Sequence, residues 1–488
     1  MLDVRTPTAP LVLDDDRLLP TAPTERAIAR ELYEQVRRLP LVSPHGHVEA
    51  QVFADDVPFP DPARLFVTPD HYVTRMLHSQ GVRLEQLGVP PRDGRAVETD
   101  GRAIWRLLCS NWHLYRGTPS RLWLEQELYE LFDVRVRPSA ATADELYDAV
   151  AERLATPEFR PRALYRRFGL ELLATTDSPL ATLEHHRRLR EDPTWSGHVV
   201  PTFRPDSLVE LRSAGWADRV AQLGGLTTTD PTTYRGFITA LEERRAAFKE
   251  LGATATDHGH LTADSAELSP ADAERVFARA LAGEASEADA AAFRAHMLGQ
   301  FARMSCDDGL VMQLHPGVHR NYDSAVFAGF GADVGFDIPT PTDYAQALHP
   351  LLERYGSHPE FTLVLFTVDE TSFSRQIAPL AGVYPSVRIG APWWFLDAPM
   401  AMRRFREATV ETAGLYNTAG FVDDTRALCS IPARHDVARR IDCGFLAGLV
   451  AQGLLPADEA AQTAVDLTYT LPKRAFKVGE PAGGELPA

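Results

Sequence analysis

The chain has 488 residues, of which 44% are hydrophobic and 24% are charged, and its formal net charge at pH 7 is −17. This composition is typical of a globular protein, and no apolar run approaches the roughly 18 residues that a membrane-spanning helix needs. The negative charge argues against nucleic acid as a partner. The four cysteines (Cys109, Cys306, Cys429 and Cys443) are scattered, with no Cys-x-x-Cys pair. This scatter favours a reducing cytoplasm and argues against a thiolate zinc cluster.

Residues 1–38 are predicted to form an irregular arm followed by a helix over 24–38, with Ile28, Leu32 and Val36 on one face. The first residues lack a basic region followed by an apolar stretch, so no signal peptide is expected. Eight short apolar or β-branched runs follow, at 39–44, 170–175, 199–203, 253–256, 310–314, 361–367, 386–390 and 420–422. Helical patterns separate most of them, for example at 179–191, 342–355 and 398–413.

Strands that alternate with helices pair in parallel, and eight of them predict a closed (β/α)8 barrel over residues 39–478. An open doubly wound sheet is the alternative fold, although no Gly-x-Gly-x-x-Gly or P-loop motif follows any predicted strand. Two long segments, at about 50–165 and 206–304, are predicted to be helical insertions. The Gly/Pro-rich end at 479–488 is predicted to be a disordered tail.

The strongest local signal is the pair His45 and His47, which follows the apolar run at 39–42. In an extended segment, residues i and i+2 point to the same side, so both imidazoles can bind one divalent metal. Asp424 follows the last predicted strand, which neighbours the first strand in a closed barrel. It can therefore complete a Zn²⁺ or Mn²⁺ site. The alternatives are a polar loop for the histidines and a helix cap or loop carboxylate for Asp424, and the neighbouring Asp423 is not the expected ligand.

Other predicted strands also end in polar or aromatic groups. His315 is either a further metal ligand, a hydrogen-bond donor to a substrate, or a structural histidine. Arg204 suits a substrate carboxylate, which a guanidinium binds through two parallel bonds, but it could equally form a salt bridge with Asp206 or another acid of the barrel. Trp393 could form a wall of a pocket or belong to the core.

The loop after the histidine pair carries Asp70, His71 and Tyr72, with Arg75 close behind as a candidate substrate contact. A tyrosine near a metal and arginines can have a lowered pKa and carry a proton. Packing in the core is the alternative role for Tyr72.

Taken in order, these motifs resemble the uronate isomerase (glucuronate isomerase) family, a divergent branch of the amidohydrolase superfamily, over about residues 25–475. The matching segments are His45-Gly46-His47, Asp70-His71-Tyr72, Thr175-Thr176-Asp177, Arg204-Pro205-Asp206, Asp257-His258, Gln313-Leu314-His315, Arg320-Asn321, Asp333-Val334-Gly335, Trp393-Trp394-Phe395, Asp424-Thr425-Arg426 and Arg434-His435. The resemblance implies a distorted (β/α)8 barrel. It also implies the aldose–ketose isomerisation of D-glucuronate to D-fructuronate and of D-galacturonate to D-tagaturonate, in uronate catabolism.

The resemblance further implies roles for individual residues. His45, His47 and Asp424 would hold a divalent metal, expected to be zinc; Arg204 would bind the uronate carboxylate; and Tyr72, His71, Asp257, Asp424 and Arg426 match positions implicated in catalysis. Two segments depart from the family pattern: Ser43-Pro44 before the histidine pair, and the loop Pro316-Gly317-Val318-His319. These departures concern substrate preference more than reaction type.

The reaction would move a proton from C2 to C1 of the open-chain sugar through an enediol, with a cation beside the carbonyl oxygen. Asp424 and Tyr72 are both candidates to carry the proton, with Arg426 favouring a phenolate on Tyr72. A metal-dependent hydrolase or deaminase on the same barrel is the main alternative. It is disfavoured because Asp257 stands where binuclear members have a carboxylated lysine, and Val318 where deaminases have a glutamate. A non-catalytic sugar-acid-binding protein is a second alternative, and a homo-oligomer is possible.

Overall fold

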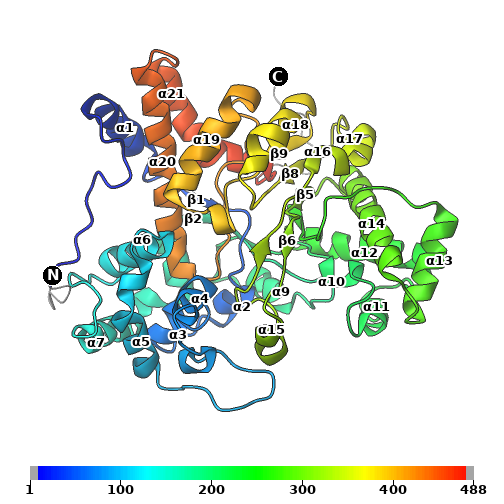
Figure 1. Cartoon of the computed structure of the whole chain (residues 1–488), viewed down its shortest axis with the longest axis horizontal. Coiled ribbons are helices and arrows are strands. Elements are labelled where there is room, and N and C mark those ends of the chain that lie inside the picture. Colours follow the sequence, from blue (N-terminus) through cyan, green and yellow to red (C-terminus); the bar gives the residue numbers. More distant parts are fainter. Residues whose placement is uncertain (1–8, 480–488) are drawn as a thin grey trace.

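The structure, a computed structural model, describes residues 9–479, so residues 1–8 of the predicted arm and 480–488 of the predicted tail lie outside it. Parallel strands form its centre (Figure 1). They are β1 (Leu41–Ser43), β2 (Leu170–Ala174), β3 (Val199–Val200), β4 (Ala255–His258), β5 (Val311–Leu314), β8 (Leu363–Leu365) and β9 (Val387–Ile389). Their hydrogen-bonded order is β1-β2-β3 in one sheet and β4-β5-β8-β9 in the other.

Single backbone bridges join the two sheets. Phe203, three residues after β3, pairs in parallel with both Asp177 and Thr256 and so connects β3 to β4. The strand β4 begins two residues later than predicted and ends at His258, so that Asp257 lies within the strand rather than beyond its end.

The eighth segment closes the ring without forming a regular strand, and the predicted strand at 420–422 is wrong in that respect. Thr418 pairs in parallel with Ile389 of β9, and the Asp424 N–H donates to the His45 carbonyl oxygen at 3.3 Å. Between these contacts the backbone leaves the extended region, with φ of +74° at Gly420 and +42° at Asp424. The predicted (β/α)8 barrel is confirmed, in a distorted form.

A buried apolar cluster fills the barrel below the carboxyl ends of the strands. It takes side chains from β1 to β5, from β8 and from the eighth segment: Val42, Leu172, Ala174, Val200, Ala255, Val311, Val364, Ala419 and Val422. Side chains from the C-terminal end, including Phe476, belong to the same cluster. Such a packed interior leaves only the strand ends and their loops to carry a polar site.

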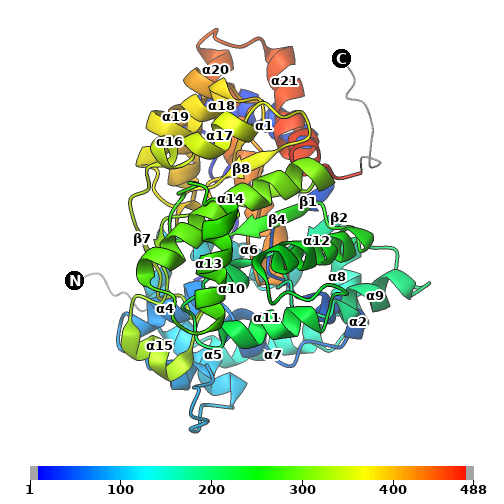
Figure 2. The same ribbon diagram turned by 90° about the vertical axis from the view of Figure 1, so that its right-hand side faces the viewer.

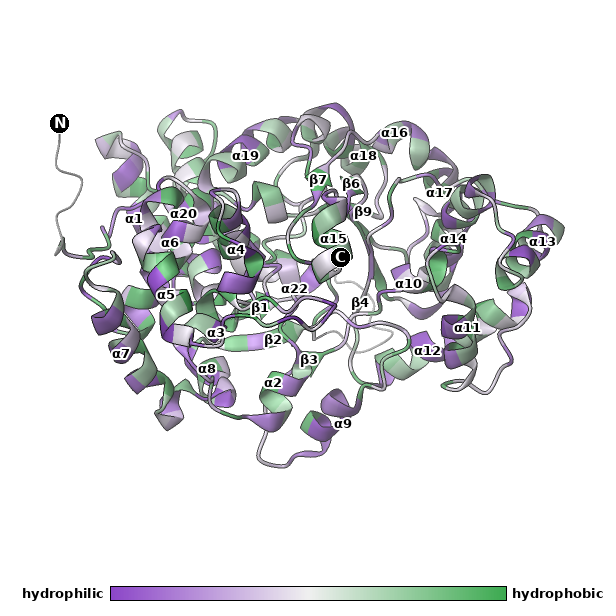
Figure 3. Ribbon diagram, turned by 60° about the horizontal axis from the view of Figure 1, so that its bottom comes forward, coloured by the Kyte–Doolittle hydropathy of each residue, from purple (hydrophilic) through white to green (hydrophobic). Residues whose placement is uncertain are grey.

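Helices surround the barrel and alternate with its strands (Figures 1 and 2). Those close to predicted helical patterns are α9 (Glu184–Glu191), α12 (Tyr234–Glu250), α13 (Pro270–Leu281), α14 (Glu287–Asp308), α16 (Tyr344–Ala347), α17 (His349–Tyr355) and α19 (Pro399–Ala413). Apolar and polar residues alternate along outer helices such as α7 and α13 (Figure 3), which is typical of helices with one buried face.

The segment at 50–165 is largely helical in the structure. Its α-helices are α2 (Ala50–Asp55), α3 (Pro62–Phe66), α4 (His71–His78), α5 (Gly101–Ser110), α6 (Pro119–Gln126), α7 (Ala143–Leu154) and α8 (Pro161–Arg167). The segment at 206–304 contributes α10 (Asp206–Val209) and α11 (Trp216–Gly224) before α12, and β4 interrupts it before α13. The division of the chain into domains stays a prediction.

Two features of the fold were not predicted. A short antiparallel hairpin of β6 (Val318–His319) and β7 (Ile338–Pro339), with α15 (Ser324–Phe330) between the strands, follows β5. At the other end, α1 (Pro23–Val36) packs against the long helix α20 (Ile431–Ala451) and against α21 (Ala457–Val465). The remaining described α-helices are α18 (Ala378–Val383) and α22 (Leu471–Ala475). None of the described helices is both long and apolar enough to cross a membrane.

Candidate active site

A cavity of about 1590 Å³ lies where the barrel strands end. Its walls come from the loops after the strands, from α4 and from the loop region around β6 and β7. Among the predicted site residues, those that line it are His47, His71, Tyr72, Arg204, His315, Trp393, Asp424 and Arg426. A cavity at this end of the barrel is where (β/α)8 enzymes hold their substrates.

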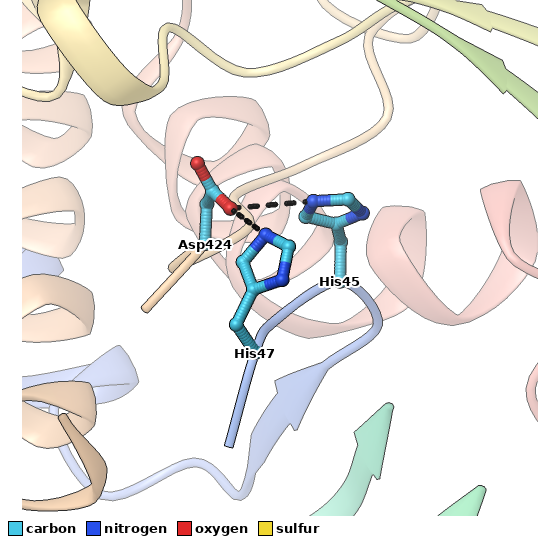
Figure 4. Close-up of side chains that lie close together, drawn as sticks. All are labelled: His45, His47 and Asp424. Atoms are coloured by element: carbon cyan, nitrogen blue, oxygen red, sulfur yellow. Dashed lines mark ion pairs between the residues drawn. The ribbon is translucent and has the colours of Figure 1, made fainter. Parts of the chain in front are cut away.

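His45, His47 and Asp424 lie close together (Figure 4), and His47 and Asp424 also line this cavity. Asp424 Oδ1 lies 3.3 Å from His45 Nε2 and 3.0 Å from His47 Nε2, and one ligand atom from each residue lies within 4.8 Å of the others. The His45 ring is fully buried, yet neither of its nitrogens has a hydrogen-bond partner among the described residues. Two imidazoles and a carboxylate around one point are a ligand set that fits a divalent metal ion.

The electrostatics of this group favour an ionised carboxylate. Burial alone would raise the pKa of Asp424, but His45 and His47 together lower it to well below its usual range. Burial outweighs the pull of Asp424 on His47 and lowers the pKa of that imidazole, so it is neutral at pH 7. Neutral His47 and ionised Asp424 are the forms that bind metal, whereas Asp257 and Asp424 outweigh burial and raise the pKa of His45, whose ring would lose a proton on binding the ion.

Asp423, the neighbouring residue, faces elsewhere. Its Oδ2 lies 3.1 Å from His435 Nε2 in α20, and the side chain is 1% exposed. The structure therefore brings Asp424, and not Asp423, to the histidine pair.

A second charged cluster surrounds Arg204. Its Nε donates to Asp206 Oδ2 at 2.9 Å, and its Nη1 lies 3.3 Å from Asp257 Oδ2. His315 Nε2 lies 2.7 Å from the other oxygen of Asp257. Burial alone would raise the pKa of Asp257, but His315 and Arg204 hold it well below its usual range. The salt bridges considered as the alternative for Arg204 are thus present, and the two acids fix its guanidinium at the wall of the cavity.

Trp393 packs between the two clusters. Its ring centroid lies 5.0 Å from that of His45 and 4.8 Å from that of His315, and the residue is 3% exposed. It also lines the cavity, so it is at once a core residue and a wall of the site.

His71 and Tyr72 form the first turn of α4, which begins where the Asp70 carboxylate accepts a hydrogen bond from the Tyr72 N–H at 2.8 Å. Burial lowers the pKa of His71 to about 3, so this imidazole is neutral at pH 7. Burial raises the pKa of Tyr72 far above its usual value, so its phenol is protonated. This direction favours the phenol over the predicted phenolate, and the guanidinium over the Tyr72 ring, at 5.3 Å, is that of Arg434 and not of Arg426.

Two other predicted arginines differ in their placement. Arg426 lines the cavity with its side chain 40% exposed, and its Nη2 lies 3.9 Å from Asp333 Oδ2. Arg75 lies over the Phe395 ring at 5.6 Å and is not among the residues that line the cavity. The structure therefore does not bring Arg75 to the substrate space, because its side chain is taken up by an aromatic contact.

Several charged residues of the site received no role from the sequence. They are Arg320 and Asp333 in the loop region after β5, Asp397 after β9, and Arg434 in α20. Arg320, Asp333 and Arg434 lie in segments that match the family, which is the one signal the sequence offered for them. Asp397 carried none.

The chain matches the family model described as glucuronate isomerase over residues 17–476. It is 55% identical over 467 residues to the uronate isomerase of Rhizobium meliloti (strain 1021), which covers 96% of this chain and 99% of that protein. The crystal structure of glucuronate isomerase from Caulobacter crescentus matches with a TM-score of 0.95 at 46% identity, covering 97% of this chain and 98% of that one. The uronate isomerase of Thermotoga maritima matches with a TM-score of 0.89 at 30% identity, covering 95% and 99%. The protein described here belongs to the glucuronate isomerase family.

Proposed function

We propose that the chain interconverts an open-chain hexuronate aldose and its 2-ketose, D-glucuronate with D-fructuronate and D-galacturonate with D-tagaturonate. One observation supports the proposal: in a chain of this family, a group of residues that could hold a metal ion, the Tyr72 phenol and the Arg204 guanidinium lie at one cavity. The family assignment does not favour the hydrolase or the non-catalytic binding protein.

His45, His47 and Asp424 would hold the metal, and the nitrogen and oxygen ligand set supports zinc. When bound, the cation supplies positive charge that stabilises negative charge on substrate oxygen atoms. Because Asp424 Oδ1 faces both histidines, the second carboxylate oxygen is the proposed base for the C2 proton. An ionised carboxylate is the form that this role requires.

Tyr72 is the proposed acid, because its phenol keeps its proton at pH 7 and can donate to the carbonyl oxygen as the enediol forms. Neutral His71, whose ring centroid lies 4.6 Å from that of Tyr72, is proposed to hydrogen-bond the same end of the sugar. Arg426 is the most exposed of the proposed catalytic groups and can donate to sugar hydroxyls.

Arg204 is proposed to bind the uronate carboxylate, with His315 beside it and Asp257 behind both. Asp206 and Asp257 hold its guanidinium plane in place, which reduces the ordering that substrate binding requires. They also offset part of its charge. Other cavity arginines, such as Arg320, would then share in the attraction of an anionic substrate.

Proton NMR of the purified protein with each aldose in D₂O tests the reaction. We expect ketose signals from at least one of the two sugars, and the deuterium content at C1 reports whether the transferred proton exchanges with solvent. The absence of ketose from both sugars with the metal-loaded protein would contradict the proposal. Metal analysis of the purified protein tests for zinc.

We also propose a cytoplasmic location and leave a homo-oligomer open. The four cysteines of the sequence are all free in the structure, which supports a reducing compartment. Fractionation of the native cells tests the location, and light scattering of the purified protein gives the number of chains in the particle.

A further inference from the structure

Arg434 is a buried arginine in the first turns of α20 that still reaches the cavity. The residue is 1% exposed, and it is among those that line the site. Buried guanidinium groups are costly unless their N–H groups and charge are matched, so the contacts of Arg434 indicate what holds it there.

Three acceptors fix the guanidinium. Its Nη1 donates to Asp397 Oδ2 at 2.5 Å and to the main-chain oxygen of Asp423 at 3.3 Å, while its Nε donates to Ser430 Oγ at 3.2 Å. The Asp423 carbonyl precedes the metal-binding residue Asp424 in the chain. The plane of the guanidinium is therefore tied directly to the segment that carries the metal site.

The face of the same guanidinium packs on aromatic rings. Its central carbon lies 3.6 Å from the centroid of Trp123 and 5.3 Å from that of Tyr72, and the two rings meet edge to face at 5.8 Å. Cation–π contacts of this kind help to fix the position of a ring and place a positive charge over its face. Burial and the carboxylates of Asp424, Asp397 and Asp70 raise the pKa of Tyr72, whereas Arg434 acts in the opposite direction.

We propose that Arg434 is a positioning residue for Tyr72, holding its ring in a fixed place relative to the metal triad. The inference rests on the proposed role of Tyr72 as proton donor. Arg434 is not proposed to donate to the substrate. It affects the reaction only because it holds the Tyr72 phenol in position. Substitution of Arg434 should therefore change the rate of proton transfer rather than the affinity for the substrate.

Arg434→Lys tests the idea, because it keeps the charge but loses the planar fork that contacts Asp397, the Asp423 carbonyl and Ser430 together. Misplacement of a reacting group by about 1 Å can cost about 100-fold in rate, so we expect kcat to fall by about 10- to 100-fold. The KM should change by less than about threefold, because the lost interaction acts in the transition state. A wild-type kcat would overturn the proposal.

A double-mutant cycle with Tyr72→Phe separates positioning from a general structural effect. Tyr72→Phe alone should lower kcat by about 10²- to 10⁴-fold, the usual contribution of an acid–base group. In that background, Arg434→Lys should lower kcat further by less than about threefold, because the group it positions is gone. If the effects of the two substitutions on kcat multiply in the double variant, the positioning role of Arg434 is refuted, and the proposed role of Tyr72 is not affected. A wild-type rate for Tyr72→Phe would overturn both the inference and the proposed role of Tyr72.

Arg245→Lys is the matched control. Arg245 is also buried, with its side chain 1% exposed, and it donates to both Asp308 oxygens, at 2.6 and 2.9 Å, away from the cavity lining. This variant should lose thermal stability comparably to Arg434→Lys and keep its kcat. If Arg434→Lys does not fold, Asp397→Asn loosens the same clamp, and it should show the same coupling to Tyr72 with unchanged metal content. Additivity of Asp397→Asn with Tyr72→Phe would likewise overturn the inference.

Discussion

Asp257→Asn offers a sharp test of the charged cluster beside the metal triad. The side chain is fully buried and contacts Arg204 at 3.3 Å and His315 at 2.7 Å. Removal of one partner from a buried ion pair costs about 3–5 kcal/mol, and an amide of the same shape retains part of each contact. We therefore expect the free energy of unfolding to fall by about 3 kcal/mol at pH 7. We also expect KM for hexuronate to rise, because Arg204 loses one of the two acids that orient it.

The pH dependence of the free energy of unfolding tests whether Asp257 is ionised in the folded protein. The pKa of Asp257 is held well below its usual range, although burial alone would raise it, because His315 and Arg204 favour the ionised form. A carboxylate with a lowered pKa adds stability that is complete above its unfolded pKa of about 3.9 and disappears only as the pH falls through the folded value. The stability gap between wild type and Asp257→Asn should therefore not narrow between pH 7 and about pH 5, where loss of Asp257 also lowers the pKa of its neighbours His45 and His315, and it should narrow below about pH 4.

Urea unfolding followed by circular dichroism at a series of pH values measures this gap. Asp442→Asn is the control, because Asp442 accepts from Arg406 Nε and Nη2 at 2.7 Å each, away from the cavity. It should lose stability and keep its KM. The reasoning about Asp257 would be refuted by a gap that already shrinks between pH 7 and pH 5, or by a KM equal to that of wild type.

Other predictions address the metal and the arginine wall. His47→Ala should lower both the bound metal and kcat, measured by elemental analysis and by ketose formation, and a normal metal content would contradict the proposed ligand set. Arg204→Met should raise KM sharply for uronates; unchanged kinetics would remove its proposed role. Gly259→Ala should raise KM as well, because its Cβ would lie 2.7 Å from Arg204 Nη2 and 2.8 Å from Asp206 Oδ2. A KM equal to that of wild type would show that Arg204 and Asp206 can shift to make room for the added Cβ.

The convergence of His45, His47 and Asp424 could be predicted from sequence because it depends on two local rules and one topological rule. His45 and His47 share a side of an extended segment, and Asp424 follows the strand that neighbours the first strand of a closed barrel. Each step needs only residue order. The observed distances, 3.3 and 3.0 Å from Asp424 Oδ1 to the two imidazoles, agree with that reasoning.

Arg434 and Arg75 show where such reasoning ends. Both are arginines in helices near the site, and nothing in their local sequence says which one reaches the cavity. The outcome depends on the partners that tertiary packing provides: Asp397 and Trp123 for Arg434, and the Phe395 ring for Arg75. The same holds for Tyr72, whose pKa depends on burial that the sequence does not reveal.

The irregular eighth segment shows how Asp424, the predicted ligand, reaches the histidines while its neighbour Asp423 does not. In a regular strand, alternation would place these neighbours on opposite faces and leave the choice to the register. Here Asp424 has a φ of +42°, a left-handed conformation that aspartate tolerates better than most residues. Its N–H bonds the His45 carbonyl while Asp423 turns to His435. The left-handed backbone at Asp424 thus accompanies the placement of its carboxylate beside the histidines, whereas in a regular strand the register alone would decide which of the two acids reached them.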